Sequence, residues 1–242
     1  MESIVYKMNP NTIEQAEINK VNRLLDQQML TLYHGTKNAD LTPSFSYNNH
    51  ENDYGKGFYT TTDSELGKEW AYSSYTKGDK GYLFEYTIDI SGLSILNLVS
   101  MDTMHWLAEL LSNRKLNLEG KEATADTVKQ LIDKYKINTS EYDLIIGYRA
   151  DDSYFVYAED FVSGAIYRDT FERAIRNGDL GIQVFVKSER AFGLLTLKNG
   201  PIEVPEKYKQ YYDKRDTAAR NKYFADIKNQ DARVKQRIYD FL

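Results

Sequence analysis

Two stretches of the chain combine glycines, aromatic residues and hydrogen-bonding side chains, the residue types best suited to holding a flat ligand. They read LYHGT (residues 32–36) and DYGKGFYTTT (residues 53–62). In the second stretch the glycines predict a loop, whereas the aromatic pair and the three threonines predict a strand that begins at once. We expect a substrate to lie at this junction, because glycines let a backbone approach a ligand closely and a strand fixes an aromatic ring.

The other reactive residue types exclude several classes of enzyme. The chain has no cysteine, which excludes disulfide scaffolds, thiolate zinc sites and cysteine nucleophiles. Its three histidines, His34, His50 and His105, stand singly and outside any H-E-x-x-H motif, so we expect no metal site. Neither a G-x-S-x-G elbow nor a phosphate-binding P-loop occurs. Any catalysis must therefore use oxygen and nitrogen groups.

Composition indicates an ordinary globular chain. Its 242 residues are enough for one large or two small domains, and a hydrophobic fraction of 41% can fill a sizeable core. The first residues lack a basic segment followed by an apolar stretch, and no apolar run approaches the length that spans a bilayer. We therefore expect a cytoplasmic protein without membrane contact.

The net charge of −5 is unevenly distributed along the chain. Residues 206–242 hold ten Lys or Arg against six Asp or Glu, so this tail carries +4 and the other residues carry −9. The tail is either a solvated helix face or a contact for nucleic acid or an acidic partner. We expect Tyr208, Tyr211 and Tyr212 to be exposed there and available to such a partner.

Periodicity and turn residues predict helices and strands that are mixed without strict alternation, which favours an α+β fold. We expect strands at residues 31–36, 57–62, 81–89, 142–148, 181–187 and 192–197. We expect helices at residues 12–28, 70–78, 102–111, 128–135, 171–177 and 224–241. The expected organisation is an N-terminal helical extension (residues 1–30), a central domain (residues 31–200) and a C-terminal helix (residues 201–242) packed on that domain or extending from it.

Three motifs in order resemble the ADP-ribosyltransferase superfamily, in its diphtheria-toxin and poly(ADP-ribose) polymerase branch with the H-Y-E signature. They are LYHGT, GKGFYTTTDSELGKEWA (residues 55–71) and IQVFVKSERAF (residues 182–192). His34 and Tyr59 match the first two signature residues, Trp70 stands at the place of a second aromatic, and Gln183 replaces the signature glutamate. The chain is more closely similar to a little-characterised bacterial group of such domains that shares DYGKGFY and a YDLIIGYRADD-like segment (residues 142–152).

The resemblance covers about residues 32–197 and implies a split, mainly antiparallel β core with flanking helices that binds NAD as a substrate. Tyr59 and Trp70 would sandwich the nicotinamide, and the backbone of Gly35 would bind its carboxamide. His34 would bind a ribose hydroxyl, and Gln183 would hold the 2′-hydroxyl as positive charge grows on the ribose. The implied catalytic residues are Gln183, His34 and Tyr59, and the implied NAD-binding residues are His34, Gly35, Thr36, Tyr59 and Trp70.

The resemblance implies a mono-ADP-ribosyltransferase that modifies a protein or nucleic acid, without a metal. Glutamine is neutral and orients a hydroxyl without accepting its proton, so elongation to poly(ADP-ribose) is not expected. A bacterial toxin or phage-defence effector, with an antitoxin or regulatory partner, fits this activity. The alternatives are a non-catalytic module that binds NAD or ADP-ribose, and an interaction protein that uses its terminal helices.

Each motif residue also has a structural interpretation. A lone histidine such as His34 can be an ordinary hydrogen-bonded residue at a strand end, and Trp70 can simply cover the core. Gln183 can face outward on its strand, since it precedes an apolar run. Asp151 and Asp152 can orient an acceptor or cap a turn. The order of the three motifs, rather than any one residue, favours the functional interpretation.

Overall fold

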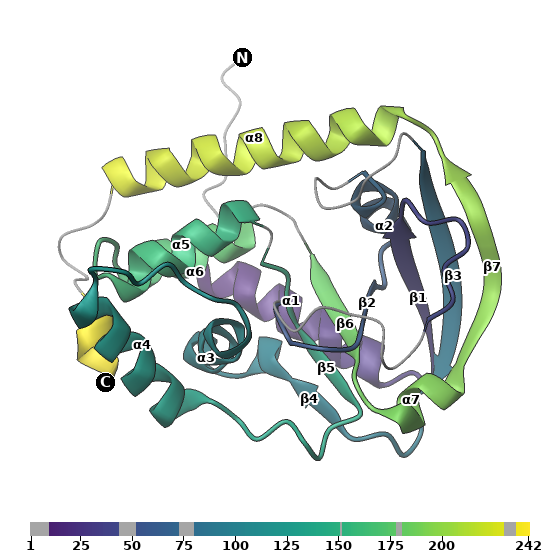
Figure 1. Cartoon of the computed structure of the whole chain (residues 1–242), viewed down its shortest axis with the longest axis horizontal. Helices are drawn as coiled ribbons and strands as arrows, with labels where there is room; N and C mark the ends of the chain where they lie inside the picture. Colours follow the sequence, from purple (N-terminus) through teal and green to yellow (C-terminus); the bar gives the residue numbers. More distant parts are fainter. Residues whose placement is uncertain (1–9, 44–51, 73–79, 151, 178–180, 230–235) are drawn as a thin grey trace.

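A single mixed sheet forms the centre of the computed structural model, which describes residues 10–43, 52–72, 80–150, 152–177, 181–229 and 236–242. Its seven strands lie in the order β4-β5-β6-β2-β1-β3-β7 (Figure 1). Neighbouring strands run antiparallel except for β4 and β5, which are parallel. The strands are β1 (Met29–Thr36), β2 (Phe58–Thr61), β3 (Gly81–Asp89), β4 (Ile95–Asn97), β5 (Leu144–Tyr148), β6 (Ile182–Val186) and β7 (Leu195–Val204).

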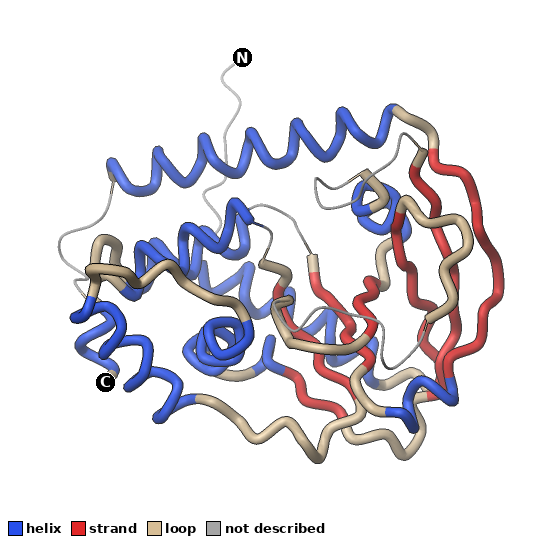
Figure 2. The backbone as a smooth tube through the Cα atoms, in the orientation of Figure 1, coloured by secondary structure: helices blue, strands red, loops and turns tan. Residues whose placement is uncertain are grey.

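Helices gather around the β4-β5 end of the sheet, whereas β1, β3 and β7 form the opposite end (Figures 1 and 2). The long helix α8 passes from the β7 end to the helical end along one side of the molecule. The expected α+β class is confirmed. The helices are α1 (Pro10–Leu25), α2 (Ser64–Trp70), α3 (Thr103–Asn113), α4 (Glu122–Tyr135), α5 (Asp152–Val162), α6 (Arg168–Asn177), α7 (Glu189–Leu194) and α8 (Lys207–Lys228), with 3-10 turns η1 (Leu98–Ser100) and η2 (Ile238–Phe241).

Side-chain caps fix where several helices begin. The Asp63 carboxylate accepts from the backbone N–H groups of Glu65 and Leu66 at the start of α2. Asp102 caps α3 through Met104 N–H, as the sequence predicts for a helix opened by that residue. These caps place α2 directly after β2 and α3 beside the buried strand β5.

Two of the expected helices lie largely outside the helices that the structure shows. The expected helix at residues 70–78 overlaps only the end of α2, because Asp63 starts that helix earlier; residues 73–79 lie outside the described chain. The expected helix at residues 224–241 is also wrong. Helix α8 ends at Lys228, and η2 is a separate turn. The apolar residues do not share a face, because Ile238 is fully buried while Phe224 is exposed.

The strand expected at residues 192–197 begins later and extends further. Ser188 accepts from Ala191 N–H and starts helix α7, which includes Phe192. Strand β7 follows from Leu195 to Val204 and pairs with β3. The expected domain boundary at residue 200 therefore falls inside this strand, and the sheet continues to the residues that lead into α8.

Candidate functional site

The three motif strands lie side by side in the sheet. Strand β2 stands between β1 and β6, with Thr61 opposite Tyr33 on one side and opposite Gln183 on the other. Since neighbouring strands are about 4.8 Å apart, these positions lie within the span of one ligand pocket. The three motifs thus lie on connected strands of one mainly antiparallel sheet, as the β core implied by the resemblance requires.

The sheet opens between β1 and β2, next to the histidine motif. Strand β1 pairs with β3 from Met29 to Thr36, whereas its pairing with β2 is confined to Tyr33 opposite Thr61. Beyond that pair, the His34 side chain bridges the two strands, and Nδ1 donates to the Tyr59 carbonyl oxygen at 2.7 Å. The strands thus form one sheet in which the pairing between β1 and β2 is reduced to a single residue pair next to His34.

The hydrogen bond of His34 fixes its tautomer. A carbonyl only accepts, so Nδ1 carries the proton and Nε2 of the neutral ring holds a lone pair. Burial lowers the pKa of His34 to about 4, against the opposing effect of the Tyr59 carbonyl. The ring is therefore neutral at pH 7. The Nε2 atom can accept a hydrogen bond from a hydroxyl. The centroid of the His34 ring lies 4.6 Å from that of the Phe58 ring.

The Tyr59 ring closes the loop that precedes its own strand. Its hydroxyl donates to the Gly55 carbonyl oxygen at 2.7 Å and accepts from Tyr54 N–H at 3.0 Å. The half-buried ring lies 4.7 Å from the Phe185 ring, measured between centroids. Burial raises the pKa of the Tyr59 phenol well above 10, so the hydroxyl stays protonated. The hydroxyl thus acts within the loop, and the ring is the part of Tyr59 that can contact a ligand.

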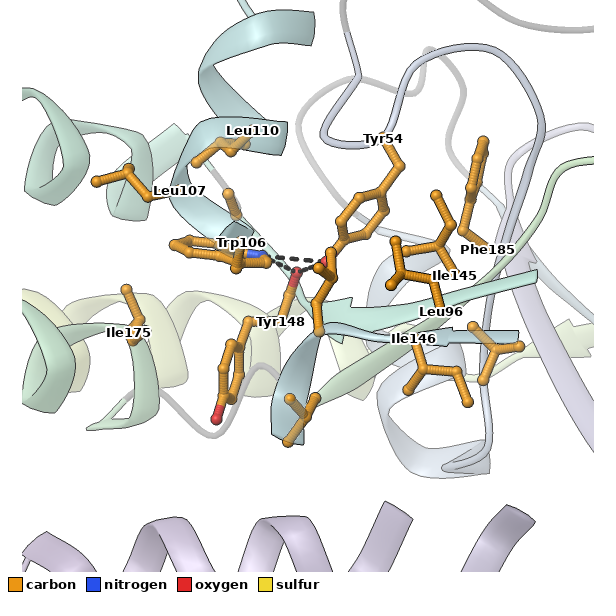
Figure 3. Packing of buried hydrophobic residues seen from close by; sticks show 14 of the residues in the cluster. Tyr54, Leu96, Trp106, Leu107, Leu110, Ile145, Ile146, Tyr148, Ile175 and Phe185 are labelled. Atoms are coloured by element: carbon orange, nitrogen blue, oxygen red, sulfur yellow. Dashed lines mark hydrogen bonds between the residues drawn. The ribbon is translucent and has the colours of Figure 1, made fainter. Parts of the chain in front are cut away.

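Tyr54 anchors the same loop to the core. Its hydroxyl donates to the Tyr148 carbonyl oxygen and accepts from Trp106 Nε1 (Figure 3). Trp106 Nε1 also donates to the Tyr148 carbonyl, at 3.0 Å. Gly147 makes room for this arrangement, since a Cβ there would lie 2.2 Å from the Tyr54 hydroxyl. The loop that the glycines predict is thus held by a buried aromatic network.

Gln183 is buried, so the interpretation of an outward-facing strand residue is wrong. Only 3% of it is exposed, and its Nε2 donates to Asp53 Oδ2 at 2.8 Å. The same oxygen accepts from Ala150 N–H at 2.9 Å, and Oδ1 accepts from Arg114 Nη1 at 3.2 Å. Arg114 also donates to the Ala150 carbonyl oxygen. The loop, β6 and the segment after β5 thus meet at one carboxylate.

Sequence reasoning missed Asp53 and Arg114. Asp53 stands inside the DYGKGFY motif, but its partners Arg114 and Gln183 lie far away in the sequence. Burial raises the pKa of Asp53, and Arg114 and the two N–H donors oppose this shift. The only sequence signal for this residue is its place at the start of the glycine-rich loop.

Trp70 is buried at the end of α2 and carries a cation on its face. The guanidinium carbon of Arg149 lies 4.4 Å from the ring centroid. Trp70 is 7% exposed, and its Nε1 is buried without a hydrogen-bond partner among the described residues. A buried indole donor without an acceptor is uncommon in proteins, and a water molecule or a polar ligand atom can serve as its partner.

Gly35 lets α2 pack directly on β1. A Cβ at this position would lie 1.9 Å from the Gly67 carbonyl oxygen and 2.6 Å from Ala71 N. The glycine is therefore required by the packing of α2 on β1. The next residue, Thr36, is buried, and its hydroxyl accepts from Asn38 N–H in the turn that ends the strand.

Several expected residues lie away from this site or outside the described chain. His105 donates from Nδ1 to the Tyr135 carbonyl oxygen at 2.7 Å, between α3 and α4. His50 and Asp151 are outside the described residues, and Asp152 begins α5. In the part of the chain that the structure describes, no cluster of three or more His, Asp or Glu could hold a metal ion. No described helix has the length and apolar character to cross a bilayer.

Helix α8 is attached to α2, next to Trp70. Arg215 Nε and Nη2 donate to the two carboxylate oxygens of Glu69, each at 2.8 Å. Tyr208 is buried and donates to Glu65, so the expectation that it is exposed is wrong. Of the other two tyrosines expected to be exposed, Tyr211 is exposed and Tyr212 half-buried. The tail expected to contact a partner thus also supports the helix that carries Trp70.

Fold and site together define an α+β protein whose mixed sheet carries a histidine, a tyrosine and a glutamine on three adjacent strands. Residues 30–197 match the model of a family described as a protein of unknown function (DUF3990), and the chain belongs to this family. No curated protein and no solved structure matches the chain at a significant level.

Proposed function

We propose that the protein is an NAD-dependent mono-ADP-ribosyltransferase whose site is the opening between β1 and β2. The observation that carries this proposal is the neutral His34, which spans the opening with its Nδ1 bonded to the Tyr59 carbonyl and its Nε2 lone pair left as an acceptor. A ribose hydroxyl is a donor that suits such an acceptor. The resemblance of the three motifs to the diphtheria-toxin and polymerase branch supports the same ligand.

The aromatic residues of the site fit the nicotinamide end of NAD. Trp70 already stacks against a planar cation, the Arg149 guanidinium, and oxidised nicotinamide is also a planar cation. The buried Trp70 Nε1 offers a hydrogen-bond donor without a partner among the described residues. The Tyr59 ring, which is held by its hydroxyl, provides a second aromatic surface that keeps its orientation.

In the proposed reaction the glycosidic bond between the ribose C1′ and the nicotinamide nitrogen breaks, and the bonding pair leaves with neutral nicotinamide. An acceptor oxygen or nitrogen forms the new bond to C1′, and its proton passes to solvent. Positive charge grows on the ribose during this step. The Gln183 amide stabilises that charge by accepting from the ribose 2′-hydroxyl, while His34 orients the ribose that it binds.

A neutral glutamine supports transfer of a single ADP-ribose to a protein or nucleic acid, since it cannot act as the base that chain elongation needs. We place this activity in the bacterial cytoplasm, as part of a toxin or a phage-defence effector controlled by a partner protein. A module that binds NAD without turnover is the second candidate, because the Gln183 amide is neutral and bonded to Asp53.

Two histidines with the same hydrogen bond provide a matched test. His34 and His105 each donate from Nδ1 to a backbone carbonyl oxygen at 2.7 Å, and both rings are half-buried. Titration calorimetry with NAD would be run on wild type, His34→Ala and His105→Ala. We expect the His34 variant to lose about tenfold in affinity and the His105 variant to match wild type. Equal affinities in all three proteins would contradict the proposed site.

Release of nicotinamide separates the two candidate functions. Wild type incubated with saturating NAD should release nicotinamide, and Gln183→Ala should release it about 100-fold more slowly, the scale for loss of one preorganised transition-state contact. Its NAD affinity should stay near that of wild type, because the aromatic residues and His34 provide most of the binding. Binding of NAD without any release by wild type would favour the binding module.

A further inference from the structure

The Asp53 carboxylate is held by donors from three separate parts of the chain. Gln183 Nε2 and Ala150 N–H donate to Oδ2, and Arg114 Nη1 donates to Oδ1. The carboxylate is almost inaccessible, since Asp53 is 7% exposed. Arg114 follows the last residue of α3 and also donates to the Ala150 carbonyl oxygen, so its own position is fixed.

This arrangement determines which way the Gln183 amide faces. The Arg114 guanidinium beside Oδ1 favours the ionised acid, and an ionised carboxylate only accepts, so Oδ2 is an acceptor for both Ala150 N–H and the Gln183 amide. The amide must therefore turn its NH₂ group toward Asp53. Its oxygen Oε1 is then the amide atom left to accept from a ligand. A reversed amide would place oxygen against oxygen at Asp53 and lose this hydrogen bond.

A second feature shows that the amide has little freedom to reverse. Gln183 is 3% exposed in the middle of the sheet, between β2 and β5, where Thr61 and Gly147 are its register partners. Turning the amide would therefore leave buried polar atoms without a hydrogen bond. The carboxylate therefore sets one orientation of the amide before any ligand arrives.

We propose that Asp53 is a positioning residue that fixes the Gln183 amide with its oxygen toward the ligand, so that the site selects a hydroxyl donor such as a ribose 2′-hydroxyl. This inference rests on the proposed function and specifies how a neutral glutamine serves in place of an acidic residue. Asp53 acts only through Gln183. The alternative is that Asp53 merely fastens the loop to the sheet.

A mutant cycle separates these two roles. The proteins are wild type, Asp53→Asn, Gln183→Ala and the double variant. Circular dichroism checks that each is folded, and nicotinamide release and NAD affinity are then measured for each. Asparagine keeps the shape but cannot accept at both of its terminal atoms, so the Gln183 amide loses its fixed orientation. We expect kcat to fall about tenfold or more in Asp53→Asn and about 100-fold in Gln183→Ala, with little change in KM.

The double variant gives the decisive result. If Asp53 acts through the amide, Asp53→Asn has no further effect on kcat once the amide is gone, so the double variant equals Gln183→Ala. If the fold-losses in kcat of the two single variants multiply in the double variant, the inference is overturned, because Asp53 then acts independently of Gln183. An unchanged kcat in Asp53→Asn, with wild type active, would overturn it as well. If none of the four proteins releases nicotinamide, the proposed function is overturned and this inference with it.

Asp143 supplies a matched control for replacing a buried carboxylate. It is 8% exposed, accepts from Ser94 N–H at 2.9 Å and pairs with Arg190 at 3.5 Å, so its surroundings resemble those of Asp53. It lies at the other end of β5, and Asp143→Asn should leave kcat unchanged. If Asp53→Asn does not fold, Asp53→Ser takes its place, because the shorter side chain leaves the Gln183 amide unheld without adding bulk to the buried site.

Discussion

The loop at residues 53–59 and helix α8 support the same site in opposite ways. Asp53 and Tyr54 are buried in this segment, and their side chains form hydrogen bonds with distant parts of the fold. In α8, a helix of 22 residues, only Tyr208, Ala219 and Tyr223 are buried. A helix that is polar on most sides is typical of a segment that bridges other elements.

The two regions also differ in how they are attached. The loop is attached along its length by core contacts, whereas α8 is attached to α2 through its first half and to α5 through its second half. Tyr208 and Arg215 bind Glu65 and Glu69 of α2, and Tyr223 donates to Asp160 of α5. We therefore expect changes in the loop to affect the stability of the whole fold, and changes in α8 to act mainly where they remove one of its attachments.

The largest effect is expected from Gly57→Ala in the loop. A Cβ there would lie 2.4 Å from Phe185 Cζ and 2.5 Å from the Val186 carbonyl oxygen, so the strand itself would have to move. We expect a loss of about 3 kcal/mol in the free energy of unfolding, measured with denaturant. Gly193→Ala is the control, because a Cβ in that helix meets nothing within 4 Å. A small effect at Gly57 would show that the loop is not rigidly packed.

The next effect concerns pH and His34. The unfolded histidine takes up a proton near pH 6.5, whereas the folded one does so only at about 4. The neutral His34 ring therefore contributes fully to the stability of the fold above pH 6.5, and this contribution is lost as the pH falls toward 4. The full difference amounts to about 3 kcal/mol in the free energy of unfolding.

Denaturant unfolding of wild type and His34→Gln between pH 7 and pH 4 measures this contribution. Carboxylates titrate in both proteins, so the difference between the two curves isolates the histidine. The loss on acidification should be steeper in wild type. Parallel curves would mean that the ring is already accessible to protons in the folded protein, and the neutral acceptor assigned to Nε2 would then be in doubt.

A smaller effect is expected when α8 loses its attachment to α2. Arg215→Ala removes both hydrogen bonds to Glu69, whose side chain is only 6% exposed and would remain buried and unpaired. We expect a loss of about 2 kcal/mol in unfolding free energy and a weaker affinity for NAD, since Trp70 follows Glu69 directly. Arg220→Ala is the control on the same helix, because its i,i+4 pair with Asp216 is exposed.

The sequence predicted the parts of the fold that depend on local pattern. The alternation at residues 81–89 and the apolar run at residues 142–148 became β3 and β5, and Asp102 began α3 as expected. The resemblance of the three motifs implied a common β core, and their strands are neighbours in the sheet. Hydrophobic periodicity and caps are local signals, and the sequence contains them in full.

The features that were not predicted from the sequence depend on contacts between residues far apart along the chain. Nothing near Asp53 shows that Arg114 and Gln183 will reach it, and nothing near Tyr208 shows that Glu65 will bury it. The apolar series from Phe224 to Ile238 predicted one helix face, but only tertiary packing decides which of these side chains is buried. Charge partners and burial are properties of the assembled fold, and a single sequence does not encode them locally.

The smallest effect is expected at an exposed position of α8. Phe224 is 59% exposed, whereas the preceding residue, Tyr223, is buried, lies 3.8 Å from the Tyr157 ring and donates to Asp160. Phe224→Ser should change the free energy of unfolding by about 0.5 kcal/mol or less, because the Phe224 ring buries little apolar surface in the folded protein. Tyr223→Phe, which removes only the hydroxyl, should cost about 1 kcal/mol or more, because it leaves Asp160 without this donor. Thermal and denaturant unfolding of the two variants side by side measures the difference. A larger loss at Phe224 than at Tyr223 would contradict the view that α8 is held by a few buried attachments, and it would mean instead that the exposed side of the helix packs against another part of the molecule.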